Sequence, residues 1–110
     1  AGAIKAVTAT VSLAATGSTN VGATIPAGST VLSVKVVVTA ADTGTGTLQV
    51  GVGGDSSLMT VSENDTQTTG MYIAETYVVE VGAVQINATV AGTPAGSGSA
   101  TVIVEYKVAG

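Results

Sequence analysis

The stretch VLSVKVVVT, from Val31 to Thr39, constrains the fold more than any other part of the chain. Side chains of a β-strand point alternately to opposite faces, so this stretch has one apolar face and one mixed face. The apolar face holds Leu32, Val34, Val36, Val38 and Ala40, and we expect it to line the core. On the mixed face, Val31 and Val37 flank Lys35. We therefore predict Val31, Lys35 and Val37 as interface residues, which meet another subunit or, failing that, water.

The same two-residue alternation continues through most of the chain, and no long window has the spacing of an amphipathic helix. Strands are expected over residues 7–13, 21–25, 31–40, 48–52, 71–81, 84–90 and 101–108. About seven or eight short strands separated by turns predict an all-β fold, an antiparallel β-sandwich of either jelly-roll or Greek-key topology. A small closed barrel is the alternative. At 110 residues, the chain is expected to form one domain over 1–110.

Several segments interrupt the alternation. Ile4 and Ala6 have the opposite parity to the residues after them, which predicts a bulge or bend near Ala6. Glu75 lies among apolar residues of the same parity and predicts a bend or bulge there, or two short strands. Residues 14–20 are rich in turn formers, and residues 53–70 form the longest irregular region. We expect that region to return Leu58, Met59 and Val61 to the body of the domain.

The composition excludes several kinds of site. The chain has no Cys and no His, and its three basic residues, which include no Arg, are Lys5, Lys35 and Lys107. A thiolate metal site, a histidine general base and a bidentate arginine clamp are therefore absent. A net charge of −4 disfavours binding to nucleic acid or to an anionic membrane surface. We expect no cofactor, no metal and a mature protein that works in solution.

Acidic residues are the remaining candidates for chemistry. Asp55, Glu63, Asn64 and Asp65 could offer oxygen ligands to calcium, but they lack the alternating spacing of a dedicated calcium loop. Solvated loop charges are the preferred interpretation. Glu75 and Glu80 could act as a glycosidase pair, but their opposite parities place them on different faces of one strand. We therefore expect no enzymatic activity and no catalytic residue.

Three shorter patterns have structural interpretations. The glycines of GVGG, residues 51–54, open no helix, so a turn is preferred over a phosphate-binding loop. The triplet from Asn87 to Thr89 matches a glycosylation acceptor, but it also fits the outward face of a strand. Lys35 is expected to pair with Glu105 if their strands are neighbours.

Four segments together resemble small virion proteins of tailed bacteriophages, a group that includes capsid decoration (cement) and head-fibre-associated proteins. They are IPAGSTVLSVKVVVTAA, GTLQVGVGGDSSLMT, TGMYIAETY and SGSATVIVEYKV, and they cover most of the chain in order. The resemblance implies a β-sandwich, often jelly-roll-like, that forms a homotrimer on the outer capsid surface of the virion. It implies the major capsid protein as the partner and brings no catalytic residue.

Capsid decoration is thus the predicted function. A receptor- or carbohydrate-binding module of a phage tail fibre or cell surface is the alternative, suggested by the long loop from Asp55 to Gly70. The scarcity of aromatic residues, three in all, counts against that alternative, because sugars commonly stack on aromatic rings.

Overall fold

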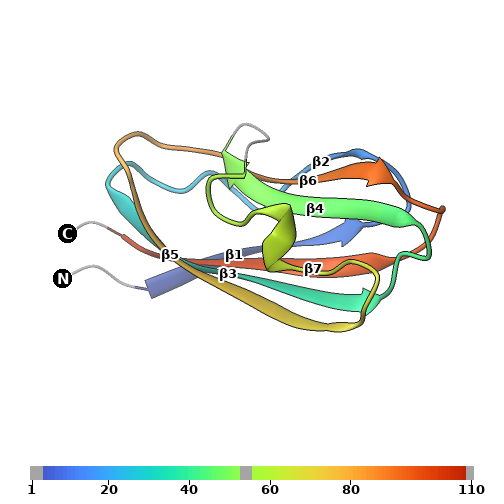
Figure 1. Ribbon diagram of the computed structural model, residues 1–110. Helices are drawn as coiled ribbons and strands as arrows, with labels where there is room; N and C mark the ends of the chain where they lie inside the picture. Colours follow the sequence, from blue (N-terminus) through green and yellow to red (C-terminus); the bar gives the residue numbers. More distant parts are fainter. Residues whose placement is uncertain (1–3, 53–55, 109–110) are drawn as a thin grey trace.

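The computed structural model describes residues 4–52 and 56–108, which form two antiparallel sheets packed face to face (Figure 1). The strands are β1 (Ile4–Ser12), β2 (Gly17–Asn20), β3 (Ser29–Ala40), β4 (Thr45–Val52), β5 (Gly70–Glu80), β6 (Ile86–Thr93) and β7 (Ser99–Lys107). A single turn of 3-10 helix, η1 (Val61–Glu63), lies between β4 and β5. The predicted all-β sandwich is therefore confirmed.

Successive strands alternate between the two sheets. One sheet has the order β1-β7-β3-β5 and the other has the order β2-β6-β4, and all neighbouring strands are antiparallel. An isolated bridge joins Met59 to Val50 of β4. The finer assignment as a jelly roll stays a prediction.

The core between the sheets is almost entirely aliphatic. Strands with uninterrupted alternation bury one of their two faces, and their fully buried residues include Ile86, Ala88, Val102 and Val104. Among the described residues, Tyr106 of β7 is the one buried aromatic residue of this core, at 7% exposure, and Tyr72 packs against the core while partly buried. Many small apolar contacts, rather than a few aromatic anchors, therefore hold the sheets together.

The second strand lies earlier than predicted. Residues 17–20, expected as a turn, form β2 and pair with β6. The residues from Val21 to Ile25 form no strand and are held by the 2.8 Å hydrogen bond from the Val21 amide to the Ile86 carbonyl and by the bridge from Ile25 to Val84. Polar pairs account for this shift. Ser18 hydrogen-bonds Thr89 at 2.9 Å, and the Asn87 side chain donates a 2.7 Å hydrogen bond to that of Asn20, so polar side chains join the paired strands.

Two irregularities change which residues of β3 face the core. Leu32 is an extra residue between Val31 and Ser33, which pair with the adjacent residues Tyr106 and Glu105 of β7. The prediction for Leu32 and Val31 is therefore wrong, because Val31 is fully buried and Leu32 is only half-buried. A second shift between Val38 and Ala40 leaves Ala40 exposed, again against the prediction.

The bulge expected near Ala6 does not exist. β1 pairs with β7 without a register shift from Ile4 to Ser12, and Ile4 and Ala6 are simply exposed on the outside. The irregularity near Glu75 is confirmed. Two residues of β5, Thr76 and Tyr77, lie opposite the single Leu32 of β3, while β5 continues as one strand.

The long connection between β4 and β5 packs back onto the domain as expected. Leu58 and Met59 are buried, but Val61 is 44% exposed, so the prediction for Val61 is wrong. Asn64 donates a 2.8 Å hydrogen bond to the carbonyl of Leu48, and Thr66 donates one of 2.8 Å to the carbonyl of Gly46. These contacts tie the connection to β4.

Candidate functional site: the outer face of the four-stranded sheet

The outer face of the four-stranded sheet carries the predicted interface residues Lys35 and Val37. The pairing registers arrange its side chains in four rows across β5, β3, β7 and β1. The rows are Val79–Thr30–Lys107–Ile4, Glu75–Ser33–Glu105–Ala6, Ile73–Lys35–Ile103–Thr8 and Met71–Val37–Thr101–Thr10. Apolar and charged groups are therefore interleaved on this face.

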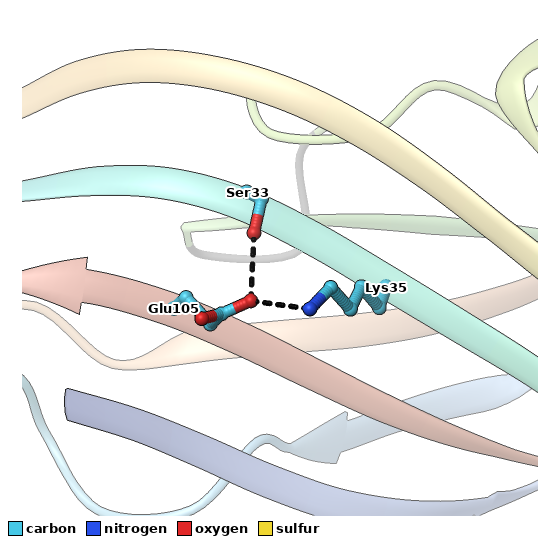
Figure 2. A network of polar contacts seen from close by, with 3 residues as sticks. All are labelled: Ser33, Lys35 and Glu105. Carbon is cyan, nitrogen blue, oxygen red and sulfur yellow. Dashed lines mark hydrogen bonds and ion pairs between the residues drawn. The ribbon is translucent and has the colours of Figure 1, made fainter. Parts of the chain in front are cut away.

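A small polar network lies at the centre of the outer face (Figure 2). The Lys35 ammonium lies 2.6 Å from Glu105 Oε1, and the Ser33 hydroxyl donates a 3.2 Å hydrogen bond to the same oxygen (Figure 2). The expected pairing of Lys35 with Glu105 is confirmed. The hydrogen bond and charge of Lys35, together with the Ser33 hydroxyl, lower the pKa of Glu105 below its ordinary value.

The three predicted interface residues do not share one face. Lys35 and Val37 are half-buried on the outer face, where a partner could reach them. Val31 has no exposed surface, because the bulge at Leu32 turns it into the core. Its side chain is unavailable to a partner. The interface itself stays a prediction for Lys35 and Val37.

Most of the large exposed apolar side chains among the described residues are found along β5. We call this group the β5 surface, and it consists of Met71 (59% exposed), Ile73 (53%), Tyr77 (73%), Val79 (61%) and Val81 just beyond the strand (91%). β5 is also an edge of its sheet and contains no Lys or Pro, the residues that commonly protect a free edge.

Sequence reasoning grouped the β5 surface on one parity but did not find that it faces outward. The sequence signal for the outward orientation was Glu75, which has the same parity as the β5 surface. In the structure Glu75 pairs with the outward Ser33. A carboxylate within an apolar row is easier to accommodate at a surface than in a core without a cation.

The outer face of the three-stranded sheet has a different chemistry. Its paired side chains are small, polar and uncharged, as in Ser18 with Thr89 and Asn20 with Asn87, whose amide donates a 2.7 Å hydrogen bond. The possible glycosylation triplet lies here, and both Asn87 and Thr89 have partners within the sheet. The two outer faces of the sandwich therefore suit different surroundings.

A buried carboxylate organises one end of the sandwich. Asp42 is 1% exposed, and its Oδ1 accepts hydrogen bonds from the backbone amides of Gly44 (2.9 Å) and Ala95 (3.1 Å). Its Oδ2 accepts from the amide of Gly46 (2.8 Å) and from the side chain of Gln67 (3.3 Å). The backbone amides, that of Gly44 first, lower the pKa of Asp42.

The acidic candidates for metal binding have structural roles. Glu63 accepts from the Thr60 amide at the start of η1, and Asp65 accepts from the Gln67 amide at 3.0 Å. Asp55 lies outside the described residues. Within the residues that the structure describes, no group of three or more acidic side chains is placed to hold a metal ion.

The remaining candidates are separated or incomplete. Glu75 pairs with the outward Ser33 and Glu80 with the buried Ser29, so the two carboxylates belong to opposite faces of β5. Gly51 and Val52 lie in β4, while Gly53 and Gly54 lie outside the described residues. In the described ranges there is no pocket. Nor do those ranges contain a helix with the length and apolar character needed to cross a membrane.

Comparison with solved structures finds the same fold in bacteriophage capsids. A chain in the capsid asymmetric unit of cyanophage Pam1 is 26% identical, with a TM-score of 0.72 over 98% of this chain and 86% of that chain. The resemblance to bacteriophage virion proteins is confirmed. A chain in the acid-stable capsid of Helicobacter pylori bacteriophage KHP30 is 15% identical, with a TM-score of 0.74, and covers 96% and 87% of the two chains. No family model and no curated protein matches the chain.

Proposed function

We propose that this chain is a capsid decoration (cement) protein of a tailed bacteriophage. In this proposal it binds the outer surface of the major capsid protein lattice as a homotrimer and reinforces the head, without enzymatic activity. The observation that carries the proposal is the similarity to the Pam1 capsid chain, which extends over 98% of this chain. That similarity supports a structural protein located in the virion capsid.

The distribution of side chains supports a structural role. One outer face has exposed apolar residues beside ordered charges, and the opposite outer face has small uncharged polar groups. Such an asymmetric surface suits a protein that contacts a protein lattice or another subunit on one side and water on the other. Exposed apolar patches of this kind are typical of protein–protein contact sites.

The proposal includes a jelly roll as the finer fold. Consecutive strands alternate between the sheets, and the Met59 bridge to Val50 supplies a remnant of an eighth strand beside β4. An eight-stranded, two-sheet arrangement of this type is common in capsid and lectin domains.

The proposal is tested by adding the purified protein to capsids of its phage that lack it. We expect saturable co-sedimentation, a fixed copy number relative to the major capsid protein, and a higher temperature of capsid disruption. Capsids that already carry the protein are the control and should take up no more. Absence of binding, or recovery of the protein from virions only in the tail fraction, contradicts the proposal.

The alternative of a carbohydrate- or receptor-binding module gains no support from the connection that suggested it. Leu58 and Met59 of that segment fill the core, and Asn64, Thr66 and Gln67 bind the backbone of β4. These five side chains are therefore engaged within the domain and are not free to bind a ligand.

A further inference from the structure

We propose that copies of this chain join edge to edge, with β5 of one copy paired to β1 of the next. β1 and β5 are the two outermost strands of the four-stranded sheet, so each has one edge without a partner strand in the described chain. This inference deepens the proposed function by naming the strands that join the subunits, and it rests on the proposed trimeric assembly.

Strand direction favours this pairing. Each neighbour in the order β1-β7-β3-β5 is antiparallel, so β5 runs opposite to β1. A second copy added in the same orientation therefore brings its β1 antiparallel to β5. The strand direction then continues to alternate from one strand to the next across the two copies. Backbone amides and carbonyls at both free edges gain partners in this way.

Charge selects β1 over a second β5 as the occupant. β5 holds Glu75 and Glu80, and none of the three lysines of the chain lies in it. Pairing β5 with another β5 would bring four carboxylates to one seam, and like charges across strands are destabilising. β1 instead carries Lys5, which is exposed and makes no ion pair with any described residue.

The side-chain rows place complementary groups together. Val79 and Ile4 occupy the two ends of one outer row, so extending the sheet puts Ile4 of the next copy beside Val79. Ile4 is 65% exposed, Val79 is 61% exposed and the neighbouring Val81 is 91% exposed.

Lys5 and Glu80 share the other face of the same seam. Lys5 lies in the row of the inward Tyr106, and Glu80 pairs with the buried Ser29. With Ile4 opposite Val79, Lys5 of the next copy lies diagonal to Glu80, a separation of about 7–8 Å that long side chains bridge. The seam thus joins apolar groups on one face and opposite charges on the other.

The contact is heterologous, since it uses two different surfaces of each copy. Such a contact closes into a ring when a whole number of subunit-to-subunit rotations makes one full turn, and otherwise it continues as a filament. The proposed homotrimer corresponds to closure after three copies.

Charge reversal tests the seam. Sedimentation velocity and native mass spectrometry would give the assembly constant of the wild type, Lys5→Glu, Glu80→Lys and the double variant. We expect each single reversal to raise the dissociation constant about fivefold to tenfold, because attraction between strands becomes repulsion. The double reversal should restore assembly to within about twofold of the wild type, since the two sites are coupled.

Matched controls separate the seam from general effects. Lys107→Glu makes the same charge change on β7, whose two edges are both paired, and should leave assembly nearly unchanged. Val79→Lys places a charge beside the apolar Ile4 of the next copy and should abolish assembly, whereas Val61→Lys makes the same change on exposed η1 and should not. Circular dichroism would establish that each variant is folded.

Several outcomes overturn the inference. These are a wild type that stays monomeric, a Lys5→Glu effect no larger than that of Lys107→Glu, and a double variant that fails to regain assembly. If Glu80→Lys weakens assembly and Lys5→Glu does not, β1 is not the strand that pairs with β5.

Capsid co-sedimentation distinguishes the two proposals. Capsid binding with no response to charge reversal refutes only the seam, and a confirmed seam without capsid binding refutes only the decoration function.

Discussion

At the scale of single residues, Asp42 shows how this chain uses a buried charge without a cation. Its two carboxylate oxygens accept from three backbone amides and one side-chain amide, which come from three separate segments. Charged groups are costly to bury unless hydrogen bonds replace their hydration. Asp42 therefore links the loop before β4 to the connections that precede β5 and β7.

Asp42→Asn should lower the melting temperature by several degrees. The variant amide can accept at only one of its two positions, so an N–H donor would face either the Gly46 amide or the Gly44 and Ala95 amides. Differential scanning calorimetry would measure the change.

Asp65→Asn is the matched control, because Asp65 also accepts from a backbone amide and a hydroxyl but is exposed, so water can replace its contacts. Equal effects of the two substitutions would contradict the role assigned to Asp42.

Asp42 and Glu105 also predict the direction of the pH dependence. Both have a pKa in the folded protein below the ordinary values of 3.8 and 4.5, so the folded state binds fewer protons than the unfolded state. Their contribution to stability is complete above those ordinary values and declines as the pH falls below them. Urea unfolding of the wild type should show this acid loss, and Asp42→Asn with Glu105→Gln should flatten it. An unchanged slope in the double variant would contradict this assignment.

At the scale of elements, the β4–β6 pair depends on a glycine near its end. Gly92 has φ of +81°, in the left-handed region, and a side-chain carbon there would lie 2.7 Å from the carbonyl oxygen of Thr45. Both the backbone conformation and the space therefore require glycine.

Gly92→Ala should lower the free energy of unfolding by about 1–3 kcal/mol, the usual cost of a strained backbone. Gly82→Ala is the control, because a side-chain carbon there meets nothing within 4 Å. It should be close to neutral in the same chemical denaturation experiment. A neutral result for Gly92→Ala would show that β4 and β6 separate easily at this end.

At the scale of the whole molecule, the core relies on full occupancy by aliphatic side chains. Leu48 of β4 has no exposed surface and is among the largest fully buried residues. Leu48→Ala should cost about 2–5 kcal/mol of unfolding free energy, through lost burial and the cavity left behind. Val61→Ala, on exposed η1, should change stability by less than about 0.5 kcal/mol. A small effect at Leu48 would mean that the two sheets close over the cavity.

Assembly makes a separate prediction about the whole molecule. If subunits associate in the native state only, the melting temperature rises with protein concentration. We expect such a rise for the wild type over an approximately hundredfold range of concentration. The rise should disappear in Val79→Lys and persist in Val61→Lys. A constant melting temperature for the wild type would contradict an association coupled to folding.

The sequence by itself determined the fold class and the orientation of the regular strands. In β6 and β7 the alternation is unbroken, and one parity of each strand, which includes Ile86, Ala88, Val102 and Val104, is buried. The pairing of Lys35 with Glu105 was predicted on the condition that their strands are neighbours, and the sheet order, which places β3 beside β7, met that condition. Local periodicity suffices in these strands, because one parity is entirely apolar and the other contains the polar or charged residues.

Only the tertiary structure decided the orientation where alternation breaks. The extra residue Leu32 reverses the parity of β3, and its position depends on how β5 and β7 pair with β3. Val31 consequently moves from a predicted interface to the core. For β5, alternation defines two faces but does not say which one the other sheet covers. That choice, which leaves Met71, Ile73 and Val79 outside, is made by packing between residues far apart in the chain.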